Sequence, residues 1–116
     1  MTDIVILNEI KEYLRVDYDD ENTTLSTILK TAQVYVRDIA RLSNEDWEAI
    51  VHRSEGRRIN NVDYSEDDLR QLEFQLKGAV LYAISYLFEH REEIEHNNLM
   101  LSLRFMLSGI REGAEF

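Results

Sequence analysis

Apolar residues recur at spacings of three and four along most of this chain, which is the period of an amphipathic α-helix. The pattern predicts a short helix within residues 4–14 and a longer one from Thr24 to about Ile39. A serine followed three residues later by an acid is typical of a helix start, and Ser43 begins such a capping box. We therefore expect a third, short helix that carries Trp47.

A second capping box begins at Ser65 and predicts one long apolar helix from about Ser65 to Ile94. Apolar residues lie nearly all round this helix, so it should be buried nearly all round. We expect the other helices of so small a chain to leave part of it uncovered, for another subunit to cover. Gly78 in its middle costs about 1 kcal/mol relative to alanine, which suggests that another helix approaches closely there.

The remaining segments complete the predicted fold. A closing helix should run from Leu99 to about Ser108, with Gly109 as its C-cap. Residues 52–64 show no sustained period and are expected to form an irregular loop or a short hairpin. With no proline and only four glycines, the chain favours long helices. The fold class is all-α: one domain over residues 1–116, a small bundle of about four to five helices around one long central helix.

Composition narrows the class of protein further. The chain has no cysteine, so disulfides, thiolate metal sites and cysteine nucleophiles are excluded. The first residues have no basic region and carry acids, unlike a signal peptide. The longest apolar-rich run, Leu76 to Phe88, is interrupted by polar residues and is shorter than the ~20 residues that span a bilayer. We expect a soluble protein, folded in a cytoplasm and without a membrane partner.

The net charge of −10 bears on possible partners. An acidic surface repels phosphate backbones, so sequence-specific DNA binding is not expected, although a surface past which DNA slides without sticking would also be acidic. One function that fits this composition is that of a small helical regulatory or protein-binding module, which does not need to assemble. A helix-turn-helix regulator would need a basic recognition helix, and none of the predicted helices is basic.

Candidate chemistry is sparse. Glu93 and His96 have the Glu-x-x-His spacing of helix-bundle di-iron sites, but those sites need a second such pair, which the chain lacks. We interpret this segment as a solvated helix end, and a helix-bundle metalloprotein as the less favoured alternative. There is no nucleophile elbow and no glycine-rich phosphate loop. We therefore expect no enzyme, no catalytic residue, no cofactor and no metal.

Three arginines, Arg53, Arg57 and Arg58, form a basic island in the acidic chain. They belong either to a solvated loop or to a contact with an acidic neighbouring subunit or a phosphate backbone. The aromatic residues near the end of the long helix are equally ambiguous. Tyr82 and Phe88 suit a core, and they equally suit an interface as anchors.

Three segments occur in an order that carries a resemblance. A short helix and an acidic turn (residues 10–20) precede the second helix. The long helix ends in the aromatic-Glu-x-Arg-Glu sequence Phe88–Glu92, and a leucine-rich closing helix is followed by Arg111. Together they resemble the head–tail connector (adaptor) family of tailed bacteriophages. Phe88 stands where tyrosine is commoner in that family, and the segment around residues 50–64 is longer than its usual loop.

The resemblance implies a helical virion subunit that assembles into a ring of about a dozen copies below the portal protein. Such a ring would extend the DNA channel and dock a tail-completion or stopper protein, at the virion head–tail junction after assembly in the host cytoplasm. We expect the long and closing helices to supply the apolar part of the subunit contact. The candidate residues for the subunit or portal interface are Tyr82, Phe88, Arg91, Leu99, Leu103 and Arg111.

Overall fold

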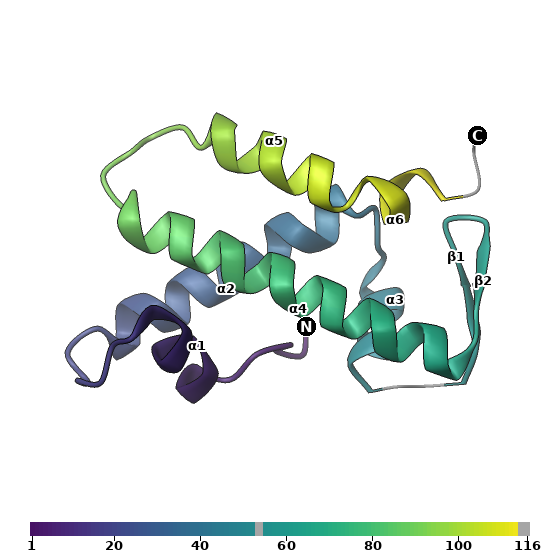
Figure 1. Cartoon of the computed structure of the whole chain (residues 1–116), viewed down its shortest axis with the longest axis horizontal. Coiled ribbons are helices and arrows are strands. Elements are labelled where there is room, and N and C mark those ends of the chain that lie inside the picture. The colour runs from purple at the N-terminus through teal and green to yellow at the C-terminus, as the bar shows by residue number, and fades with distance from the viewer. Residues whose placement is uncertain (53–54, 114–116) are drawn as a thin grey trace.

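The computed structural model describes residues 1–52 and 55–113, and these fold into six helices and one two-stranded hairpin (Figure 1). This confirms the all-α prediction. The elements in chain order are α1 (Leu7–Leu14), α2 (Asn22–Ile39), α3 (Asn44–Val51), β1 (Arg57–Ile59), β2 (Val62–Tyr64), α4 (Glu66–Glu89), α5 (Asn97–Met106) and α6 (Ser108–Glu112).

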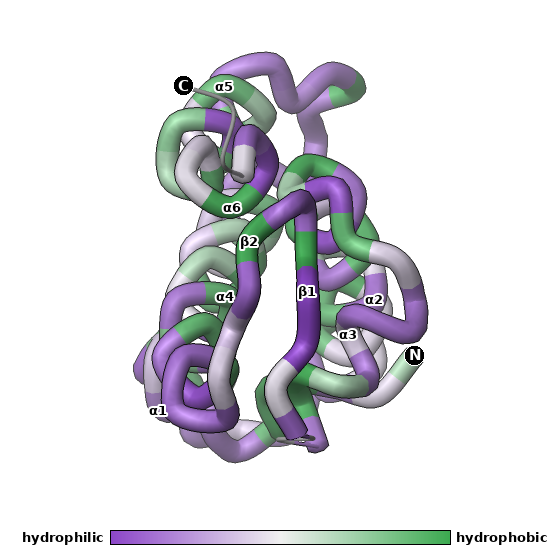
Figure 2. Tube along the Cα trace, turned by 90° about the vertical axis from the view of Figure 1, so that its right-hand side faces the viewer, coloured by the Kyte–Doolittle hydropathy of each residue, from purple (hydrophilic) through white to green (hydrophobic). Residues whose placement is uncertain are grey.

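Helix α4 is the centre of the fold, and its main partner is α2. Seen end-on, α4 lies between α1 and α5 in one layer, and α2 and α3 form a second layer beside it (Figure 2). The stripe that faces inward follows the helical period predicted from the sequence. Its buried members are Leu69, Leu72, Leu76, Ala79, Val80, Ala83, Ile84 and Leu87.

The start of α4 agrees with the prediction and its end does not. Ser65 Oγ accepts the backbone N–H of Asp68 at 3.1 Å, which completes the predicted capping box. The helix ends at Glu89, five residues before the predicted end at Ile94. Two features explain the early stop. The acids that follow would be repelled by the negative end of the helix dipole, and His90 folds back so that its Nδ1 lies 2.9 Å from the Tyr86 carbonyl oxygen.

The closing segment divides into two helices, which the sequence pattern did not show. Helix α5 ends at Met106, and the short α6 continues from Ser108. Gly109 was expected to cap the closing helix, but it lies inside α6. The break at Leu107 changes the chain's direction so that both Leu107 and Ile110 are buried.

Of the two options for residues 52–64, the structure shows a hairpin over residues 57–64; residues 53–54 lie outside the described part. Strands β1 and β2 pair antiparallel, with Ile59 opposite Val62. Asn60 and Asn61 connect the strands with φ angles of 48° and 67°. Positive φ at both central residues is the requirement of the two-residue turn that matches strand twist, and asparagine tolerates it well.

The N-terminal segment that precedes α1 is held by polar groups on α2 and α3. The side chain of Gln33, fully buried on α2, accepts the backbone N–H of Ile4 at 2.7 Å and donates to Asp3 at 3.0 Å. The indole of Trp47, equally buried on α3, donates to the Thr2 carbonyl at 2.7 Å. A buried polar group is tolerated only when it is bonded, so these bonds fix the path of the segment across the core.

Replacing Gln33 with leucine should lower the free energy of unfolding by about 1–3 kcal/mol, because the Ile4 N–H would stay buried without an acceptor. Urea unfolding followed by circular dichroism measures the change. Gln71→Leu, on the exposed side of α4, is the matched control and should change stability by less than about 0.5 kcal/mol. Equal effects of the two substitutions would contradict this account of the N-terminal segment.

Candidate subunit interface

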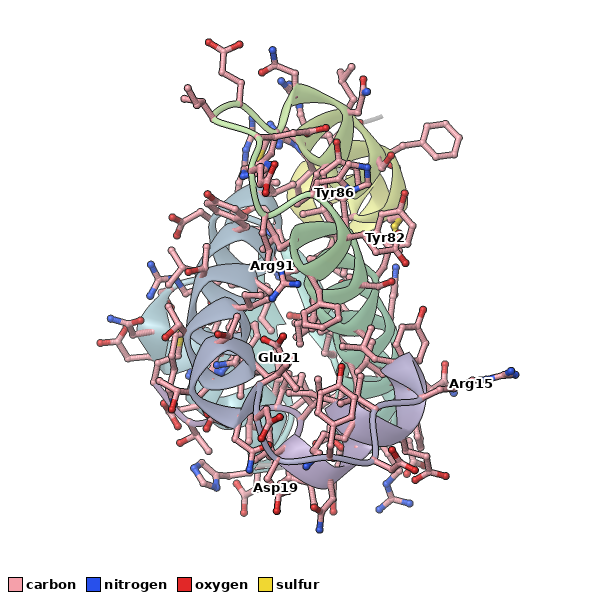
Figure 3. The ribbon with its side chains drawn as sticks, turned by 90° about the vertical axis from the view of Figure 1, so that its left-hand side faces the viewer. Arg15, Asp19, Glu21, Tyr82, Tyr86 and Arg91 are labelled. Atoms are coloured by element: carbon pink, nitrogen blue, oxygen red, sulfur yellow. The ribbon has the colours of Figure 1, made fainter. Side chains whose placement is uncertain are left out.

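Large apolar side chains that the fold leaves exposed gather on α4 and α5. Tyr82 on α4 is 38% exposed, and Leu101 and Phe105 on α5 are 66% and 83% exposed. Together with Met106 these residues line an open depression of about 470 Å³, whose remaining wall is Ser102. We call this group of four apolar residues the α4–α5 apolar surface. Figure 3 shows Tyr82 on the outer side of α4, beside α5.

The exposed strip continues along α4 through Gly78 to Phe74, which is 66% exposed. These two residues lie one and two helical turns before Tyr82, so all three share a face. The expectation that another helix approaches Gly78 is wrong for the part of the chain that the structure describes. A Cβ added to Gly78 would meet no atom of another described element within 4 Å.

The Phe88–Glu92 segment ties the end of α4 to the start of α2. Arg91 Nη1 lies 3.0 Å from the Glu21 carboxylate, and the guanidinium sits 4.6 Å above the centre of the Phe88 ring. Figure 3 shows Arg91 and Glu21 facing each other between the two helices. Phe88 is half-buried against the core. Both candidate interface residues therefore have intramolecular partners, and Arg91 orients Phe88 by a cation–π contact.

Glu93 and His96, the pair with the Glu-x-x-His spacing of a metal site, both contact Tyr86. The Tyr86 hydroxyl donates to Glu93 Oε2 at 3.3 Å, and its ring meets that of His96 edge-on at 6.1 Å. The other face of the ring stacks on His90 at 4.1 Å. Desolvation, and then the negative charge of Glu93, raises the pKa of the Tyr86 hydroxyl. Within residues 1–52 and 55–113, no three histidine or acidic side chains are grouped as metal ligands.

Leu99 and Leu103 were predicted interface residues, but the structure places both in the core of the subunit. Each is fully buried, as is Leu107 at the same helical spacing. They are therefore not available to a neighbour while the subunit stays folded. Residues two positions further along a helix point about 200° away. The exposed pair Leu101 and Phe105 follows from this geometry once the buried stripe is known, and the sequence reading missed it.

Arg111 is half-buried and has an internal role as well. Its Nη1 donates to the Ile39 carbonyl at the end of α2, at 3.1 Å. Arg41 Nη1 is 3.5 Å from the Arg111 carbonyl oxygen. Desolvation lowers the pKa of the Arg111 guanidinium, and the charges of Arg41 and Arg104 lower it further. Within the described part of the chain, none of these three arginines has a carboxylate within ion-pair distance, and the charge of Glu112 partly offsets their effect by raising the pKa of Arg111. We call these three arginines the basic cluster.

Two of the three predicted loop arginines, Arg57 and Arg58, form ion pairs within the subunit. Arg57 Nε lies 2.6 Å from Asp46 on α3, and Arg58 Nη1 lies 3.1 Å from Asp63 on the opposite strand. The second pair is largely exposed, so it contributes little to stability. Arg53 lies outside the described residues. A contact of this group with a neighbour stays a prediction.

Asn60, which the sequence reading did not single out, joins three elements. From the hairpin tip, its side-chain nitrogen donates to the Ala40 carbonyl after α2 at 3.0 Å and to the Ile110 carbonyl of α6 at 2.8 Å. Gly113 packs so closely that a Cβ there would lie 1.8 Å from the Asn60 carbonyl oxygen. These contacts of Asn60 with Ala40, Ile110 and Gly113, which we call the Asn60 junction, hold α6 and Arg111 against the end of α2.

Two glycine substitutions test the junction. Asn60→Gly and Asn61→Gly both keep positive φ without strain, but only Asn60→Gly removes the two side-chain hydrogen bonds. Asn60→Gly should therefore cost about 1–3 kcal/mol more of unfolding free energy than Asn61→Gly. Thermal unfolding of both variants measures the difference. Equal stabilities would show that the bonds do not hold the junction.

The fold and the exposed surface together define a class of protein: a small helical subunit with an open apolar surface, suited to assembly with other chains. The chain belongs to the phage gp6-like head–tail connector family, whose sequence model matches residues 5–112. The family consists of structural phage virion proteins, as the resemblance indicated. Neither curated proteins nor solved structures gave a match. Among the described residues, no helix has the length and apolar character needed to cross a bilayer.

Proposed function

We propose that this chain is the subunit of a ring that lies between the portal and the tail of a phage virion. About a dozen copies would close the ring, extend the DNA channel of the portal and present a docking surface for the tail-completion protein. The family membership supports a place at the head–tail junction. The structural observation that carries ring formation is the α4–α5 apolar surface.

Monomeric soluble proteins rarely expose contiguous large apolar side chains without a use for them. Phe105 is 83% exposed and Leu101 is 66% exposed, on a helix whose other face is completely buried. Burying one such side chain against a neighbour stabilises the contact by about 1.5–3 kcal/mol, and several copies of a weak contact close a ring cooperatively. The surface thus supplies what an assembly contact needs, and aromatic residues are its usual anchors.

The net charge of −10 suits the proposed channel. A cyclic arrangement buries two different faces of each subunit and leaves the others for the lumen, the portal and the tail. A lumen of the same sign as the phosphate backbone does not hold DNA, so the DNA can slide through it. Base-specific contacts are not required by this function.

Two aspartate substitutions on one helix separate assembly from folding. Leu101→Asp changes an exposed position and should keep the helical circular dichroism signal, while assembly at high concentration falls about tenfold or more. Leu103→Asp places a carboxylate in the core and should unfold the subunit, since that penalty is comparable with a total stability of about 5–15 kcal/mol.

Sedimentation velocity beside circular dichroism distinguishes the two variants, with the wild-type protein as reference. Wild-type protein should form closed oligomers as its concentration rises, or when the portal protein is added. Full assembly of Leu101→Asp would show that the α4–α5 apolar surface is not the contact. A wild-type chain that stays monomeric under both conditions would contradict the ring itself.

A further inference from the structure

The connection between α4 and α5 exposes a second surface, which differs in chemistry from the α4–α5 apolar surface. Ile94 is 97% exposed, and it lies between Glu92, Glu93 and Glu95. We call these four residues the acidic turn. An isoleucine with its side chain almost entirely in water contributes nothing to its own fold, and the flanking carboxylates surround it with negative charge. The turn therefore presents one protruding apolar side chain surrounded by carboxylates.

The outer face of α5 has the complementary chemistry. Leu101, Arg104 and Phe105 are all exposed and lie at helical spacings of three and four, so they share one face. The depression is lined by apolar side chains of Tyr82 and α5, and Arg104 precedes its lining residue Phe105 on the helix. Arg104 also belongs to the basic cluster with Arg41 and Arg111, since its charge acts on the Arg111 guanidinium.

Within one copy, the acidic turn and the basic cluster around Arg111 lie far apart. The acidic turn precedes α5 at one end of the molecule, whereas α6 and Arg111 follow α5 at the other end (Figure 1). Helix α5 has ten residues and so separates them by about 15 Å. A second copy can bring its own acidic turn to this surface, and its own surface then stays free for a third.

We propose that the acidic turn of one copy docks on the α4–α5 apolar surface of the next copy, with Ile94 in the depression and the glutamates facing Arg104 and its basic cluster. This inference rests on the proposed ring and names its head-to-tail contact. The contact is heterologous, because it joins two different surfaces, and such contacts repeat around a ring. The charges steer and orient the approach, while the isoleucine supplies the apolar burial.

A second acidic turn, around Tyr18, is the alternative candidate for the segment that docks on the next copy. Tyr18 is 51% exposed and is also flanked by acids. Its neighbour Asp19 is already paired with Lys11, at 2.6 Å, and that contact lowers the pKa of the Asp19 carboxyl. The acidic turn at 92–95 has the more exposed apolar residue and no lysine or arginine partner among the described residues. The observations therefore favour Ile94, and Tyr18 provides the control.

Because the chain has no cysteine, engineered thiols report the contact without background. Glu95→Cys marks the turn, and Ser102→Cys marks the wall of the depression with a near-isosteric change. Under oxidising conditions the mixture of the two variants should cross-link about tenfold faster than either variant alone. Adding Ile94→Asp to the Glu95→Cys chain should reduce cross-linking about 10- to 100-fold, and adding Tyr18→Asp should leave it unchanged.

Each other outcome overturns the inference. Preferential 102–102 cross-links would indicate a two-fold contact. Suppression by Tyr18→Asp instead of Ile94→Asp would show that Tyr18, not Ile94, docks on the next copy. Wild-type rings without selective 95–102 cross-linking would overturn this contact while the proposed function stands. Absence of both wild-type assembly and selective cross-linking would remove the proposed function together with the inference.

Discussion

The packing of α4 on α2 is the constraint on which the rest of the structure depends. A helix of 24 residues with apolar side chains around most of its circumference needs cover on every side, and the chain has 116 residues with which to provide it. Helix α2 covers the inward stripe, and α1, α3 and α5 cover the flanks. The outer strip from Phe74 through Gly78 to Tyr82 stays exposed within the described part of the chain, and the exposed residues of α5 widen it.

Polar contacts at the ends of the elements keep the smaller elements in place around α4. Arg91 joins the end of α4 to Glu21 at the start of α2, and Asn60 joins the hairpin and α6 to the end of α2. The position of α5 follows from its own buried leucines and from α6, which the Asn60 junction anchors. The exposed apolar surface is thus presented by helices that packing and these contacts hold in place, so a neighbour would meet a preorganised surface.

Local signals predicted much of the fold, and tertiary contacts decided the rest. The serine caps at Ser43 and Ser65 and the stripe on α4 were readable because each depends on residues within one or two turns. The end of α4 at Glu89 depends on the fold-back of His90, and the division at Leu107 depends on what that leucine buries. For the candidate interface, the sequence indicated that α4 and α5 carry exposed apolar residues. It could not show which face of α5 is exposed. Leucines occur on both faces of α5, and only packing against α4 shows that Leu103 is inside and Leu101 is outside.

Electron cryomicroscopy of the assembled wild-type protein tests the central claim most directly. That claim is that the apolar strip left uncovered by its own chain is covered by another copy. The account predicts a closed ring in which Tyr82, Leu101 and Phe105 are buried between adjacent subunits. A ring in which these side chains face solvent or the lumen, with subunits joined through other helices, would contradict it.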